Sequence, residues 1–261
     1  MPTDVPYCGL PPVPGALAWN LDPLLIGALL TIGALYGAGA RVAEITPRHQ
    51  AFFFAGWLLT AAALISPLCN LSVALFSARV AQHMILTLVA APLVVLGEPF
   101  HALARLFGRA APRPPGNRSV ALGTAAFAAA LWIWHLPGPY DATLRSDVVY
   151  WAMHLTTFAA ALLLWRGLLH PASCAGAGLV SGVATAVQMT LFSCILSLAP
   201  HPLFVVHART TQAWGLSPLT DQQLGGLIMW VPGGLLFTLY GVAAFAILLQ
   251  RIGERSAALR H

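Results

Sequence analysis

Long apolar segments alternate with short polar stretches along this chain. Each segment is close to the roughly 20 residues that a helix needs to cross a bilayer. The segments are continuously apolar instead of alternating, which is typical of membrane helices and not of barrel strands. The sequence therefore predicts about seven transmembrane helices, which span Pro23 to Ala40, Ala51 to Pro67, Val80 to Gly97, Ser119 to His135, Val148 to Leu168, Leu179 to Ala199, and Leu224 to Gln250.

The composition agrees with this pattern. Of the 261 residues, 58% are hydrophobic and only 8% are charged, whereas soluble domains carry roughly 25% charged residues. We expect an all-α integral membrane protein built as a single bundle. Residues 1–22 would form a periplasmic N-terminal segment, residues 23–250 the transmembrane domain and residues 251–261 a cytoplasmic tail. The first of these carries no basic residue, so no cleavable signal peptide is expected.

The basic residues predict an orientation. All 13 are arginines, and with seven spans all but three of them fall on the same side as the tail. Only Arg79, Arg145 and Arg209 fall on the other side. The positive-inside rule then places the N-terminus outside and the C-terminus in the cytoplasm. The net charge of +5 is thus explained by topology and contact with anionic lipid, and no nucleic-acid partner is expected.

Histidine and methionine occur together inside two of the spans, as Gln82-His83-Met84 and Met153-His154. An intramembrane imidazole is costly and therefore marks a functional-site hypothesis. Imidazole with thioether or thiolate suits copper, above all Cu(I). The predicted topology places donors from several helices in one layer, roughly 5–10 Å below the outer helix ends. The candidate metal ligands are His83, His154, His135, Met84, Met153, Cys194 and Met229.

Structural explanations compete with ligation at each of these positions. The histidines can bond to a neighbouring helix, methionine is a common gap-filler in packed helices, and buried free cysteine behaves as a small hydrophobe. Adjacent helical residues point about 100° apart, so His83 and Met84 cannot both face one axis squarely. The histidines are therefore stronger candidates than the sulfur side chains.

The remaining cysteines and prolines have structural interpretations. Cys8 and Cys69 are both expected outside, where a disulfide can persist, but sequence alone does not establish the pairing. Cys174 is expected to be a cytoplasmic free thiol. Pro92 and Pro232 lie within spans, where each removes a backbone hydrogen bond and can kink its helix.

Other motifs and absences narrow the function. Thr220-Asp221-Gln222-Gln223 fits a capping box that opens the last helix. Without lysine the chain can form neither a retinal-type Schiff base nor a phosphate loop. Its acidic residues lie at expected helix ends or in loops, whereas an ion pump would place carboxylates in mid-span.

Several short strings, in order and at fitting spacing, resemble those of CtaG-type cytochrome c oxidase assembly factors, which are seven-helix bacterial inner-membrane proteins. The resemblance covers most of the chain, from Trp19 to Trp230. The matching strings are Trp19-Asn20-Leu21-Asp22-Pro23, Gln82-His83-Met84, Ala91-Pro92-Leu93, Leu96-Gly97-Glu98-Pro99, Trp134-His135 with Tyr140, His154 with Trp165, and Asp221-Gln222-Gln223 with Gly226 and Met229-Trp230.

The resemblance implies a non-enzymatic role in maturing the copper-containing terminal oxidase, by transient Cu(I) delivery from the periplasmic side or by holding an assembly intermediate. It implies oxidase subunits as partners, and a periplasmic copper donor is a further candidate. The chain departs from many relatives in two places. It has Arg79-Val80 where they carry a further His-Met pair, and it lacks a histidine near Val149-Tyr150. Both departures reduce the ligand set.

Two other functions remain open at this point. The protein could be a metal-free structural partner of an oxidase subunit, with its histidines satisfying buried hydrogen bonds. It could also be a membrane haem protein in which His83 and His154 ligate the iron axially.

Overall fold

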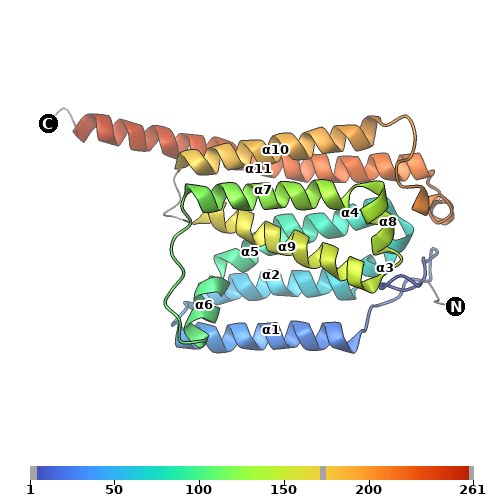
Figure 1. Ribbon diagram of the computed structural model, residues 1–261, viewed down its shortest axis with the longest axis horizontal. Helices are drawn as coiled ribbons and strands as arrows, with labels where there is room; N and C mark the ends of the chain where they lie inside the picture. Colours follow the sequence, from blue (N-terminus) through green and yellow to red (C-terminus); the bar gives the residue numbers. More distant parts are fainter. Residues whose placement is uncertain (1–4, 171–174, 259–261) are drawn as a thin grey trace.

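The computed structural model describes residues 5–170 and 175–258, which are helical wherever they are regular (Figure 1). Within these residues, five helices are long and apolar enough to cross a membrane, and two bent pairs raise the possible number of spans to seven. The chain is thus an all-helical, multi-pass membrane protein. The helices are α1 Pro23–Val42, α2 Pro47–Ile65, α3 Pro67–Ala74, α4 Phe76–Met84, η1 Ile85–Ala90, α5 Ala91–Leu96, α6 Pro99–Leu106, α7 Asn117–Trp134, α8 Pro137–Thr143, α9 Asp147–Leu169, α10 Ala175–Leu198, η2 Val205–His207, η3 Thr211–Trp214 and α11 Pro218–Ala258.

Proline and short polar side chains set the helix starts. Proline is preorganised for the first helical position, where its missing N–H is no loss. It opens six helices, at Pro23, Pro47, Pro67, Pro99, Pro137 and Pro218. The residue before proline is disfavoured in helical geometry, and this explains the two bent pairs. Ser66 and Leu136 adopt extended backbone, and the axes turn by 50° between α2 and α3 and by 81° between α7 and α8.

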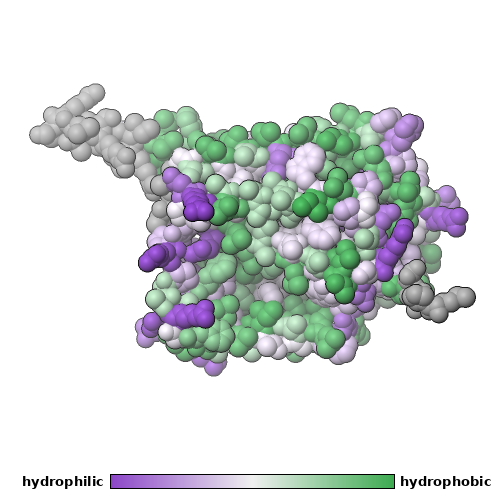
Figure 2. Space-filling model, in the orientation of Figure 1, coloured by the Kyte–Doolittle hydropathy of each residue, from purple (hydrophilic) through white to green (hydrophobic). Residues whose placement is uncertain are grey.

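The span made of α4, η1 and α5 lies at the centre of the bundle. Within its most apolar window 61% of the residues are buried, against 22% for α1. The α4 segment packs against α11 and α3, α7 against α9 and α10, and α2 against α5. On the face that Figure 2 shows, most hydrophilic residues lie at the two ends, with a mainly apolar band between them.

The structure corrects two expectations about helix ends. The last helix was expected over Leu224 to Gln250, but α11 begins at Pro218 and continues to Ala258. The capping box at Thr220 is therefore wrong. Ser217 caps this helix instead, because its hydroxyl accepts the Thr220 N–H at 3.0 Å.

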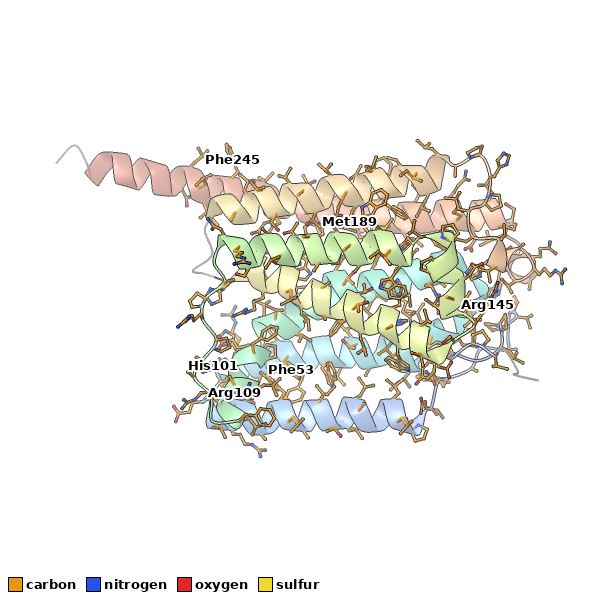
Figure 3. All side chains as sticks on the ribbon, in the orientation of Figure 1. Phe53, His101, Arg109, Arg145, Met189 and Phe245 are labelled. Carbon is orange, nitrogen blue, oxygen red and sulfur yellow. A yellow bond between two sulfur atoms is a disulfide. The ribbon has the colours of Figure 1, made fainter. Side chains whose placement is uncertain are left out.

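The two ends of the bundle carry different residues. Arg145 lies at the end that holds the N-terminal segment, whereas His101 and Arg109 lie at the opposite end (Figure 3). The last turns of α11 project beyond the other helices at that opposite end (Figure 1). The pairing of Cys8 with Cys69, which the sequence left open, is formed as a disulfide and ties the N-terminal segment to α3. Cys174 lies outside the described residues.

Candidate metal centre

The helix that carries His83 is fixed at its N-terminus by a carboxylate from another span. Leu75, the residue before α4, makes no side-chain cap. Instead Asp221 of α11 accepts the Phe76 N–H at 2.7 Å and the Ser77 N–H at 3.2 Å, and the Ser77 hydroxyl donates to it as well. The first N–H groups of a helix have no intrahelical acceptor, and the buried carboxylate supplies one. Its negative charge also interacts favourably with the positive end of the helix dipole.

His83 of α4 and His154 of α9 meet inside the bundle. Their ring centroids are 5.2 Å apart and the planes are inclined by 74°. Both side chains are buried, and both Nε2 atoms lack a hydrogen-bond partner. Nδ1 of His154 lies 3.1 Å from the Tyr150 carbonyl oxygen. An Nδ1–H that donates there leaves the lone pair of Nε2 free, as in histidines that bind metals.

His135 extends this pair to a row of three imidazoles. Its ring centroid lies 6.4 Å from that of His83. Its Nδ1 lies 2.7 Å from the Leu131 carbonyl oxygen, so the same tautomer argument applies. His135 follows the last residue of α7, where the chain leaves the helix before Pro137.

A small cavity lies beside these rings. Its volume is about 20 Å3, and its lining includes His83, His135, Met84 and Thr157. The Thr157 hydroxyl is buried without a partner in the structure. This volume is close to the minimum that holds one water molecule, whereas organic ligands occupy sites of roughly 300–1,000 Å3. The cavity therefore suits a single ion or water and leaves no room for a porphyrin.

The donor set that converges is small. Among the described residues, no three side chains of histidine, cysteine, aspartate or glutamate come together in a way that could hold a metal. The His83–His154 pair is thus the core of the candidate centre, and Met84 is the sulfur donor that shares a cavity with His83. Cu(I) accepts low coordination numbers and soft ligands, so this set favours it over metals that require four or more donors.

The other candidate ligands do not line the small cavity beside His83. Met153 and Met229 are fully buried in the large apolar cluster that also contains Phe237. Cys194 is a half-buried free cysteine on α10. Packing accounts for these positions without a metal. Met189, at the centre of α10 (Figure 3), belongs to the same cluster and was not anticipated, because the predicted donor layer lies only near the outer helix ends.

Arg79 is the least expected residue near the histidines. It lies one helical turn before His83, so both project from the same face of α4. Its side chain is 1% exposed, donates to the Thr143 hydroxyl and lies 5.0 Å from the centre of the Tyr140 ring. No carboxylate within the described chain pairs with it, and its charge acts on all three imidazoles.

A neighbouring histidine completes the surroundings of Arg79. The Tyr140 hydroxyl lies 2.7 Å from Nε2 of His207, a residue on the loop before α11. Burial, followed by the Arg79 charge, lowers the pKa of His207 to about 3. His207 is therefore neutral at physiological pH and adds no second positive charge beside Arg79.

The segment that follows His83 departs from α-helical geometry. Ile85–Ala90 forms a π-helix, in which the Ala91 N–H donates to the Leu86 carbonyl five residues back. The next bond in this register would run from residue 92 to the Thr87 carbonyl, but Pro92 has no N–H. The Trp165 indole of α9 donates to that carbonyl instead, at 2.7 Å. Such π segments occur often at functional sites.

Three further histidines lie at the opposite end of the bundle. His49 and His101 approach Glu98 there at 3.6 and 3.4 Å. Together with His170 they line a separate cavity of about 380 Å3. These three histidines therefore lie apart from the His83–His154 pair.

Comparison with known protein families gives a match over most of this chain. Residues 34–251 match the family described as cytochrome c oxidase caa3 assembly factor (Caa3_CtaG). No curated protein and no solved structure matches the chain. The matched region contains the whole central span, all three clustered histidines and the aspartate that caps α4. The chain therefore belongs to the cytochrome c oxidase caa3 assembly factor family.

Proposed function

We propose that this assembly factor binds Cu(I) transiently at the N-terminal end of its bundle and delivers it to a caa3-type cytochrome c oxidase. The observation that carries the proposal is the His83–His154 pair, whose two Nε2 atoms are buried without partners. A buried polar atom without a hydrogen bond is costly. A bound metal ion would satisfy both atoms at once.

The charge of the site suits release as well as binding. Two neutral imidazoles leave the full positive charge on Cu(I), and Arg79 adds a second positive charge one turn away. Repulsion between them weakens binding in a buried site, where charges are poorly screened. A protein that passes its metal on requires such a moderate affinity.

The orientation of the bundle decides which compartment the site serves. The opposite end carries most of the arginines, so the positive-inside rule places the histidine end on the outer side. Oxidase copper centres are loaded from that side. We therefore assign an oxidase subunit as acceptor and a copper-carrying protein outside the membrane as donor, in the inner membrane of a bacterium.

A metal-free structural role is the second candidate. It is favoured by the absence, in the described residues, of a third converging donor, and by Arg79 at a position where many relatives carry histidine. In that case the protein would stabilise an oxidase subunit by helix contacts alone. Metal binding separates the two roles, because association with the oxidase fits both.

The deciding experiment is a Cu(I) competition titration with a chromophoric chelator on the detergent-purified protein. The wild type is compared with His83→Ala/His154→Ala and with the matched control His49→Ala/His101→Ala at the other end. We expect binding in the wild type and the control and its loss in the first variant. Equal binding in all three proteins, or none in the wild type, would overturn copper delivery.

The cellular test follows the same logic. His83→Ala should lower the copper content of the oxidase without lowering the amount of the assembly factor in the membrane. Unchanged oxidase activity in this variant would contradict delivery through His83.

A further inference from the structure

We propose that Cys8 and Cys69, when reduced, form a second Cu(I) site that lies in series with the histidine pair. This inference rests on the proposed copper function, and it adds a loading site controlled by thiol redox state. The disulfide is formed in the structure, so the site would exist only after its reduction.

The sulfur pair and the histidine pair are joined by one side chain. The Tyr150 hydroxyl lies 3.3 Å from Cys8 Sγ and 3.5 Å from Cys69 Sγ. The centre of the Tyr150 ring lies 4.2 Å from that of His154, which in turn faces His83. The two soft sulfur donors are therefore separated from the first imidazole by the length of a single tyrosine side chain.

The two cysteines are held together by more than their bond. The Asn70 amide, next to Cys69 in the chain, donates to the carbonyl oxygens of Cys8 and Leu10 at 2.9 Å each. It also accepts the Ala18 N–H at 3.1 Å. Tyr7 stacks on Tyr150 at 4.8 Å. These contacts do not involve sulfur, so they would keep both thiols beside Tyr150 after reduction.

The surroundings favour the charge of a copper dithiolate. Cu(I) bound by two thiolates carries one negative charge, and burying it requires donors or a counter-charge. The Tyr150 hydroxyl can donate to sulfur, and the Asn20 amide already does so to Cys69 Sγ at 3.7 Å. The charge of Arg79, which has no carboxylate partner among the described residues, also acts on Tyr150. The same arginine that repels Cu(I) at the histidines would thus stabilise it at the thiolates.

The chemistry requires a reductant, which we assign to the class of dithiols. A dithiol attacks one sulfur of the pair, closes to its own disulfide and leaves two cysteine thiols, so two electrons and two protons enter the protein. Cu(I) then displaces the two thiol protons to form the dithiolate complex. Cys8 is 5% exposed whereas Cys69 is fully buried, so the dithiol would reach Cys8 first. Exchange with a disulfide of the same partner class, which takes up the two electrons and two protons and becomes a dithiol, would re-form the Cys8–Cys69 bond and release Cu(I) toward His154.

Copper stoichiometry tests this arrangement. The purified protein is titrated with Cu(I) under nitrogen, with the disulfide intact or after reduction by a phosphine, which takes the oxygen of water and leaves two thiols. We expect reduction to add one Cu(I) per chain, with copper–sulfur scattering in the X-ray absorption spectrum. Cys8→Ser/Cys69→Ser should lose this addition, whereas the matched control Cys174→Ser/Cys194→Ser should keep it.

The outcomes separate this proposal from the histidine site. His83→Ala/His154→Ala should bind no Cu(I) when oxidised and one when reduced. No added copper on reduction of the wild type would overturn the dithiolate site while leaving the histidine site intact. Failure of the phosphine to release any thiol from the folded protein would overturn it equally. Alkylation of the reduced wild type tests the same site without a substitution, and it should abolish only the added copper.

Discussion

The carboxylate of Asp221 caps the helix that begins at Phe76, with 2.7 Å between Oδ2 and the backbone nitrogen. The contact joins residues 145 positions apart, and it ties the last span to the central one. The residue therefore sets the height and tilt of α4 and, through α4, the position of His83. A motif residue with no evident chemistry of its own thus acts on the candidate metal centre through the backbone.

Replacing this carboxylate by an amide should destabilise the protein. Asp221→Asn removes the charge and at least one of the three hydrogen bonds, and bonds to charged groups contribute about 1.5–3 kcal/mol each. We expect a lower melting temperature in detergent and weaker Cu(I) binding. Asp147→Asn is the matched control, because Asp147 is an exposed residue in the first turn of α9. Equal melting temperatures of the two variants would contradict the role of Asp221.

The Trp165–Thr87 bond and Pro92 should be energetically coupled. Trp165→Phe keeps the ring on Phe237 but leaves the Thr87 carbonyl unsatisfied, which costs about 1–3 kcal/mol. In a Pro92→Ala background the backbone N–H of residue 92 can donate to the Thr87 carbonyl. Trp165→Phe should therefore lower the unfolding free energy by less in that background. A double-mutant cycle of unfolding free energies measures this difference. Additive effects would show that Trp165 does not compensate for the proline.

Arg79 should affect the two proposed copper sites in opposite directions. Arg79→Gln removes a charge one turn from His83, which at an effective dielectric of about 20 corresponds to about 1–2 kcal/mol, or roughly tenfold in affinity. Cu(I) should bind more tightly at the histidine pair, measured in the oxidised protein, and less tightly at the thiolate pair, which is present only in the reduced protein. Competition titrations in both states measure these changes. Shifts of the same sign would show that Arg79 does not discriminate between the sites.

The N-terminal segment should loosen in acid. The Tyr7 hydroxyl and the Leu24 N–H both donate to Asp22 and hold the pKa of its carboxyl below the usual value. The pKa of Asp22 is lower in the folded protein than the value of about 3.9 in the unfolded chain, so the ionised carboxylate stabilises the fold at pH values above that value. This stabilisation is lost as the pH falls through the folded pKa. Melting temperatures between pH 6 and pH 3 should fall less in Tyr7→Phe. Tyr240→Phe, which removes a hydroxyl at the other end, should keep the wild-type slope.

The sequence predicted the features that depend on local pattern. Apolar length located the spans, and the cost of an intramembrane imidazole singled out His83 and His154, which do meet. It did not predict the contacts between distant residues. The capping-box interpretation did not identify the partner of Asp221, and Arg79 was considered only as a topology signal and as a replacement for a histidine of relatives, not as a buried charge beside the histidines. The π-helix escaped notice because its cause, a proline, is equally compatible with a simple kink.

The π-helix also determines how the part of the central span that carries His83 is rotated about the helix axis relative to the part that follows. Successive residues of an α-helix turn by about 100°, and a π turn accommodates one residue more. The part of the span that follows His83 is held in place by the Thr87–Trp165 hydrogen bond and by packing on α2 and α9. Removal of one residue from Ile85–Ala90 would therefore swing His83 by about 100° away from His154. Every donor would still be present in the sequence, yet the two imidazoles would no longer share a face.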